Sequence, residues 1–119
     1  MIKYNHDKGV DDMNQKIFFN KLVRDQIPEI IESQQYKCEY KILSDEEYSV
    51  LLEKKLDEEV QEFHCDKTLE ELADILEVTF SLCESIGYSK DDLMNLYHKK
   101  HLEKGGFSKK IYLISKEKE

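Results

Sequence analysis

The sequence predicts a mainly α-helical protein, an antiparallel helical bundle of about four helices with a small β appendage. One Pro and four Gly among 119 residues leave few turn-forming residues, which disfavours an all-β sandwich or barrel. Three helix-start signals each precede a stretch with apolar residues at helical spacing. Five Phe and seven Tyr supply aromatic material for one core, in a chain of ordinary single-domain length.

The N-terminal end differs in composition from the rest of the chain. Residues 1–15 are polar and have no apolar periodicity, so we expect a polar N-terminal extension there. Residues 16–119 are expected to form a single domain. Its first helix is predicted to run from about Asp25 to Gln34, because Pro28 suits the first turn of a helix.

Three longer helices are predicted from their capping residues. A Ser or Thr followed three residues later by an acid marks a helix start, and the chain has this pattern at Ser44 with Glu47, Thr68 with Glu71 and Ser89 with Asp92. The three helices are expected to end near His64, at Gly87 and at the Gly105-Gly106 pair. Two short strands, near 38–43 and 107–114, are expected to pair with each other, since an unpaired strand leaves its backbone groups unsatisfied.

Charge and hydropathy exclude several classes of function. The 18 basic residues against 26 acidic ones give a net charge of −8, whereas nucleic-acid and anionic-membrane binders need clustered positive charge. No apolar run approaches the roughly 18 residues that span a bilayer, and the N-terminus lacks a signal-peptide core. The three cysteines form no Cys-x-x-Cys pair. A soluble, cytoplasmic protein with no nucleic-acid or membrane partner is therefore expected.

Several acids fall on the apolar faces of the predicted helices. At about 100° of rotation per residue, Glu59 and Glu62 lie within the apolar arc of the 44–64 helix, Glu71 lies within that of the next helix, and Asp74 lies at its edge. An antiparallel hairpin would place Glu62 opposite Glu71 and Glu59 opposite Asp74, so four carboxylates can surround one pocket. Oxygen ligands without His or Cys favour Mg²⁺, with Mn²⁺ as a substitute.

Less specific interpretations of the same charges stay open. Acidic pairs are common in so acidic a chain and are usually solvated, and Glu71 has a second role available as the capping partner of Thr68. Three lysines fall on the apolar arcs, and they are Lys55, Lys100 and Lys104. A lysine side chain at such a position can extend along apolar surface until its ammonium reaches water. Glu58 lies nearer the polar face of its helix.

Four segments resemble motifs of the all-α nucleotide pyrophosphohydrolases, the MazG-like and phosphoribosyl-ATP pyrophosphohydrolase-like superfamily. Residues 55–62 and 71–74, Lys-Leu-Asp-Glu-Glu-Val-Gln-Glu and Glu-Leu-Ala-Asp, are similar to the Glu-Glu-x-x-Glu and Glu-x-x-Asp motifs of that superfamily. Residues 20–29, Asn-Lys-Leu-Val-Arg-Asp-Gln-Ile-Pro-Glu, and 103–107, Glu-Lys-Gly-Gly-Phe, resemble two further blocks of one small-domain branch. The branch has Lys where this chain has Gln26, and Arg where it has Lys104.

The resemblance implies an activity and a set of site residues. Members of the superfamily cleave a nucleoside triphosphate between the α and β phosphates, giving a monophosphate and pyrophosphate, as in house-cleaning of the nucleotide pool. Metal ligands implied by the match are Glu59, Glu62, Glu71 and Asp74. Lys100 is implied as a phosphate contact, and the other basic candidates for nucleotide or phosphate binding are Lys21, Arg24, Lys55 and Lys104. Glu58, Glu59 and Glu62 are the candidate catalytic acids, with Glu58 as an acceptor of the proton of the attacking water.

Two other classes of protein compete with this assignment. A di-iron carboxylate bundle requires Glu-x-x-His on two helices, and none of the four histidines follows a Glu by three positions. A non-catalytic binding or regulatory module of the same fold is the main alternative. Assembly is also predicted, because an apolar arc covering more than half of the 68–87 helix exceeds what one antiparallel partner buries, so we expect a homodimer or higher homo-oligomer.

Overall fold

Four α-helices make up the regular structure of residues 16–119, the part of the chain that the computed structural model describes. The helices are α1 (Ile27–Ser33), α2 (Asp45–Asp66), α3 (Leu69–Ser85) and α4 (Lys90–Lys104). The prediction of a mainly α protein is confirmed. The extension predicted for residues 1–15 lies outside the described residues.

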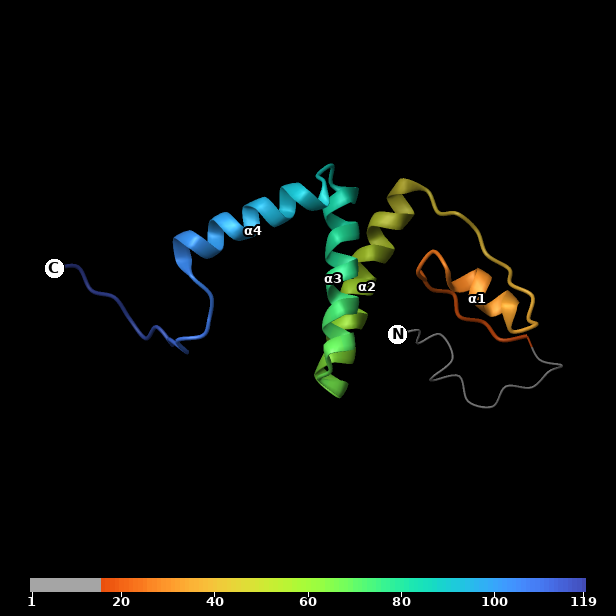
Figure 1. The fold of residues 1–119 in the computed structure, drawn as a ribbon, viewed down its shortest axis with the longest axis horizontal. Helices are drawn as coiled ribbons and strands as arrows, with labels where there is room; N and C mark the ends of the chain where they lie inside the picture. Colours follow the sequence, from red (N-terminus) through yellow and green to blue (C-terminus); the bar gives the residue numbers. More distant parts are fainter. Residues whose placement is uncertain (1–15) are drawn as a thin grey trace.

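Helices α2 and α3 form an antiparallel hairpin, the central feature of the molecule (Figure 1). Its tip is short because Lys67 adopts the left-handed conformation (φ 47°, ψ 46°) and its N–H donates to the carbonyl of Phe63, which closes α2. Thr68 then starts α3 by accepting a hydrogen bond from the N–H of Glu71 at 3.3 Å. The hairpin predicted from the sequence is confirmed.

The capping signals mark the helix starts correctly. At Ser44 and Ser89 the structure has reciprocal capping boxes, in which the hydroxyl accepts from the N–H of Glu47 or Asp92 and that residue's carboxylate accepts from the N–H of the serine. Each box satisfies two backbone donors that a helix N-terminus leaves without an intrahelical partner. The local sequence therefore marks where α2 and α4 begin.

Helix α4 turns away from the hairpin instead of closing a bundle (Figure 1). It follows a turn in which Gly87 has φ 98° and the buried thiol of Cys83 lies 3.3 Å from the carbonyl oxygen of Ser89. Among the four helices, α4 approaches only α3. The prediction of an antiparallel bundle therefore holds for α2 and α3, while α4 projects outward as a separate element.

The predicted β appendage is wrong for the described residues. Neither residues 38–43 nor residues 107–114 form a strand, and the two segments lie at opposite ends of the molecule (Figure 1). A strand is stable only when a neighbouring strand satisfies its backbone groups. The outward course of α4 carries the C-terminal segment away from the partner that the prediction required.

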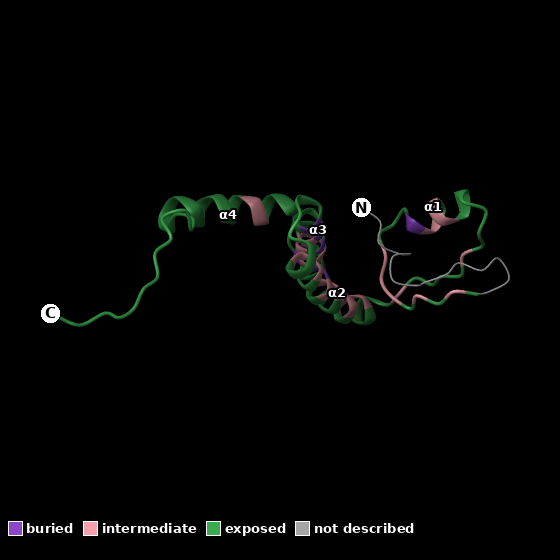
Figure 2. Cartoon of the chain, turned by 90° about the horizontal axis from the view of Figure 1, so that it is seen from below, coloured by how far each residue is buried: buried purple, intermediate pink, exposed green. Residues whose placement is uncertain are grey.

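The buried side chains of residues 16–119 are few, and three of them are acidic. Figure 2 shows burial along the hairpin and at the start of α1, with α4 exposed or at most half-buried. The buried apolar residues are Ile27, Leu52, Val78 and Cys83, and the buried acids are Glu59, Glu71 and Asp74. None of the described helices combines the length and hydropathy needed to cross a membrane. The hairpin is therefore both the structural core and the place where acids are withdrawn from water.

Candidate functional site

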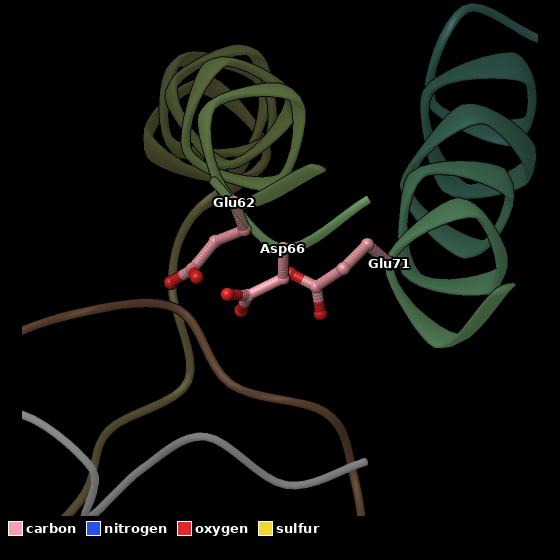
Figure 3. Close-up of side chains that lie close together, drawn as sticks. All are labelled: Glu62, Asp66 and Glu71. Carbon is pink, nitrogen blue, oxygen red and sulfur yellow. The ribbon is translucent and has the colours of Figure 1, made fainter. Parts of the chain in front are cut away.

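Three carboxylates meet near the tip of the hairpin. One oxygen each from Glu62, Asp66 and Glu71 lies within 4.8 Å of the other two. Glu62 and Asp66 are one turn apart on α2, and Glu71 comes from the first turn of α3, so the tight tip brings them together (Figure 3). We refer to these residues as the acidic triad.

The acidic triad is buried on one side and open on the other. Glu71 is 2 % exposed, Glu62 is half-buried and Asp66 is exposed. Two like unit charges about 4 Å apart repel by about 1 kcal/mol in water and by about 4 kcal/mol near a protein surface. A cation bound at the open side would relieve this repulsion, which makes the triad a candidate metal site.

Asp66 is the member of the triad that the sequence analysis missed. The motif comparison ends its first acidic block at Glu62, and the predicted helix ends near His64, which places Asp66 in the turn. In the structure α2 continues to Asp66. The signal that identifies Asp66 is its spacing of four residues from Glu62, which puts both side chains on one face of a helix.

The other two predicted ligands, Glu59 and Asp74, line a cleft between the N-terminal segment and the hairpin. The cleft has a volume of about 450 Å³. Its lining residues from the N-terminal segment include Lys21 and Arg24, and those from the hairpin include Tyr48, Leu52, Lys55, Glu59, Asp74, Glu77 and Val78. The cleft therefore combines buried acids with three basic side chains.

Ion pairs accompany both buried acids of the cleft. An Nη2 atom of Arg24 lies 3.2 Å from Oδ1 of Asp74, whose side chain is 8 % exposed. The ammonium of Lys55 lies 3.4 Å from Glu58 and 3.8 Å from Glu59. Lys55 is thus held along its own helix beside two acids, which offsets the cost of burying Glu59.

The predicted basic residues fall into two groups. Lys21, Arg24 and Lys55 all line the cleft. Lys100 and Lys104 are exposed on α4, which starts at the end of the hairpin opposite its tip and runs outward (Figure 1). Within one chain, the structure therefore does not bring Lys100 and Lys104 to the acids. The prediction that it would do so depended on α4 packing in the bundle, whereas α4 runs outward.

At the start of α3 the structure has the Thr68 half of the predicted capping box, a hydrogen bond donated by the backbone N–H of Glu71. Its N–H donates to the hydroxyl of Thr68, and its carboxylate points toward Glu62 and Asp66 (Figure 3). The capping contact and the acidic triad therefore use different atoms of Glu71.

Comparisons with known proteins add no family assignment. No family model matches the chain, and no significant match is found among curated proteins or among solved structures. The chain's own residues and the motif resemblance are therefore the basis for assigning a function.

Proposed function

We propose that this protein is a Mg²⁺-dependent nucleotide pyrophosphohydrolase, which cleaves a nucleoside triphosphate between the α and β phosphates and releases a monophosphate and pyrophosphate. The observation that carries the proposal is the acidic triad, formed by Glu62, Asp66 and Glu71 within 4.8 Å. Two of its members lie in the motifs that resemble the nucleotide pyrophosphohydrolases. The third, Asp66, adds a carboxylate at the same place.

The donor set of the triad fits a hard divalent cation. Oxygens that share one Mg²⁺ at about 2.1 Å are at most about 4.2 Å apart, close to the 4.8 Å that limits the spacing of the triad. Glu62, Asp66 and Glu71 would hold the ion, with Mn²⁺ as a substitute metal. Glu59 and Asp74, the other two ligands implied by the motif resemblance, line the cleft beside Lys55 and Arg24 and lie outside the triad.

The cleft supplies the phosphate-binding groups. Its volume of about 450 Å³ falls within the range of roughly 300–1,000 Å³ that small-molecule sites occupy. Lys21 and Arg24 enter it from the N-terminal segment and Lys55 enters it from α2. Cations at fixed positions stabilise the negative charge of a polyphosphate and of its transition state.

The proposed chemistry needs a proton acceptor beside the acids. A bound divalent cation would neutralise phosphate charge and lower the pKa of an attacking water. Glu58, whose side chain is 41 % exposed and lies 3.4 Å from Lys55, can receive the proton of that water. Its partial exposure allows the proton to leave to solvent.

The direct test is an assay for pyrophosphate release with Mg²⁺ across standard and modified nucleoside triphosphates. We expect release of pyrophosphate and a nucleoside monophosphate from at least one of them, and loss of both products in EDTA. Release of inorganic phosphate alone would contradict cleavage between the α and β phosphates. No turnover of any nucleotide with Mg²⁺ or Mn²⁺ would overturn the proposal.

A non-catalytic nucleotide-binding module of the same fold is the second candidate. It is favoured by the Arg24–Asp74 and Lys55–Glu59 ion pairs, which offset two of the buried charges without a metal. This candidate predicts calorimetrically detectable nucleotide binding that is independent of Mg²⁺ and is not followed by hydrolysis. The enzyme predicts Mg²⁺-dependent turnover.

A further inference from the structure

We propose that two copies of this chain exchange their C-terminal arms, so that residues 90–119 of each copy pack across the α2–α3 hairpin of the other. We call residues 90–119 the arm. The proposal concerns an interaction surface and does not depend on the proposed catalytic activity.

The arm has little support within its own chain. Helix α4 contains no buried residue, and its apolar side chains Leu96, Tyr97 and Leu102 are 53 %, 54 % and 87 % exposed. Beyond α4, Phe107 and the run from Ile111 to Ile114 are each at least 78 % exposed. An isolated helix of 15 residues is marginal in water, so α4 requires a surface that covers its apolar side chains.

The hairpin offers an exposed apolar row on α3. Leu69, Leu72 and Leu76 are 82 %, 47 % and 50 % exposed, and their spacing of three and four residues places them on one face of the helix. An exposed row of this kind is typical of an interaction site. The row and the arm are therefore two apolar surfaces of one chain that lack cover in the described structure.

The exposed area is large enough for a stable dimer. The chain exposes 10908 Å², whereas a compact monomer of 14.2 kDa exposes about 6,800 Å². Even after subtracting about 2,500 Å², the largest area that 15 residues of any conformation can expose, the remaining surface exceeds that of a compact domain of residues 16–119 by about 2,300 Å². If each of two chains buried this excess, the interface would bury about 4,600 Å² in total, within the roughly 2,000–5,000 Å² that obligate homodimers bury.

The two surfaces also carry opposite charge. Residues 45–85 contain 14 acids and three lysines, a net charge of −11, whereas the arm contains eight lysines and five acids, a net charge of +3. Opposite net charges attract the arm to a hairpin and disfavour pairing of two hairpins. Since each chain carries both an arm and a hairpin, a reciprocal exchange closes with two-fold symmetry and leaves neither surface uncovered.

Sedimentation and light scattering of the full chain at micromolar concentration test the assembly. We expect twice the 14.2 kDa mass of one chain. Leu102→Glu, within the arm, should give a monomer, and Leu72→Glu, within the apolar row, should do the same. The matched control is Ile42→Glu, because Ile42 and Leu102 are both 87 % exposed but Ile42 lies outside both surfaces. A monomeric wild type, or a Leu102→Glu variant that stays dimeric, would overturn the proposal.

Cross-linking of the wild type tests the exchange without any variant that could misfold. A carbodiimide joins lysines to carboxylates directly, and a mixture of isotopically light and heavy chains distinguishes links between chains from links within one chain. We expect mixed-isotope links between arm lysines, such as Lys100 and Lys109, and hairpin acids. Arm-to-hairpin links of uniform isotope only would show that the arm folds onto its own hairpin and would sink the exchange.

Discussion

The α2–α3 hairpin and the C-terminal arm carry similar helical signals but have different surroundings. Helices α2 and α4 both start with reciprocal capping boxes. The hairpin nevertheless holds most of the buried residues of the described chain, including three acids, whereas α4 holds none. A capping signal thus starts a helix, and tertiary contacts decide whether the helix is buried.

The hairpin and the arm also differ in whether their apolar side chains are buried or exposed. In the hairpin, apolar residues such as Leu52 and Val78 are buried together with the acids Glu59, Glu71 and Asp74. In the arm, apolar residues such as Leu102 and Phe107 cover nothing in their own chain. The hairpin therefore gathers the buried acids, and the arm exposes apolar side chains.

The largest expected effect belongs to Glu62→Gln, which removes one charge from the acidic triad and keeps its shape. We expect pyrophosphate release to fall by about 100-fold or more. The melting temperature in EDTA should stay the same or rise because repulsion decreases, and the Mg²⁺-induced rise should shrink. The control is Glu53→Gln, an exposed acid of the same helix, which should change none of the three measurements.

A loss of stability of Glu62→Gln in EDTA would contradict the expectation that Glu62 is repelled by neighbouring acids. A Glu62 that stabilises the protein through a lysine would give a clear loss of stability in EDTA, because the substitution would leave that lysine without its counter-charge. Such a loss, together with an unaltered Mg²⁺ response, would contradict a metal site at the triad.

Substitution of Arg24 tests whether the hairpin depends on the N-terminal segment. Arg24→Met removes the guanidinium 3.2 Å from the nearly buried Asp74, and we expect a loss of about 1–2 kcal/mol in the free energy of unfolding, because Arg24 is half-exposed and partly screened. The measurement is urea denaturation at neutral pH. Lys16→Met, which removes an exposed pair with Glu39, should cost less than about 0.5 kcal/mol. Equal effects from the two variants would show that burial of Asp74 contributes nothing.

Dilution tests whether the arm depends on a second copy. If α4 is covered only in a dimer, its amide protons exchange through the dissociated chain, and a tenfold dilution should speed their exchange about threefold, following the square root of concentration. Amides of the α2–α3 interface should change less, because part of their protection comes from packing within one chain. Hydrogen exchange followed by mass spectrometry measures both regions in one sample. Concentration-independent exchange in α4 would mean that the helix is stable alone.

Local features of the fold were predictable from the sequence, and long-range features were not. The starts of α2, α3 and α4 follow from Ser44, Thr68 and Ser89, because a cap acts within four residues. The strand pairing was wrong because it depends on where α4 carries residues 107–114. That direction is set by contacts between distant parts of the chain, which helical periodicity does not encode.

In the candidate site too, the positions set by local geometry were predictable from the sequence, and those set by long-range packing were not. The proximity of Glu62 and Glu71 could be predicted because a hairpin fixes which residues face each other across two neighbouring helices. Asp66 was missed because a helix end is uncertain by one or two residues. Lys100 was expected as a phosphate contact from the motif resemblance, and its position depends on where α4 packs, which the sequence does not determine. The structure therefore brings Glu62 and Glu71 together near the hairpin tip and puts Glu59 and Asp74 in the cleft, whereas Lys100 and Lys104 lie on α4.

The smallest expected effect concerns the capping box that starts α2. The N–H of Ser44 donates to Glu47 at 3.2 Å, and this backbone hydrogen bond, with the nearby charge of Lys41 and the Ser44 hydroxyl, lowers the pKa of Glu47 below its ordinary value. A lowered folded-state pKa means that the ionised carboxylate stabilises the fold above the unfolded pKa of about 4.3. This stabilisation is lost as the pH falls through the folded-state pKa.

Glu47→Gln makes that pH dependence measurable. The amide oxygen of Gln can still accept the hydrogen bond from Ser44, but it does not titrate in this range. We therefore expect the wild type to be slightly more stable than Glu47→Gln at pH 6, and the difference in melting temperature to shrink below the unfolded pKa of about 4.3 and to level off once the pH has fallen through the lowered folded-state pKa of Glu47. Glu46→Gln is the control, because Glu46 shares the first turn of α2 and its interaction with the helix dipole but lies outside the capping box. An equal pH dependence for Glu46→Gln would assign the effect to the helix dipole rather than to the hydrogen bond with Ser44. A pH-independent difference for Glu47→Gln would show that ionisation of Glu47 does not cause it.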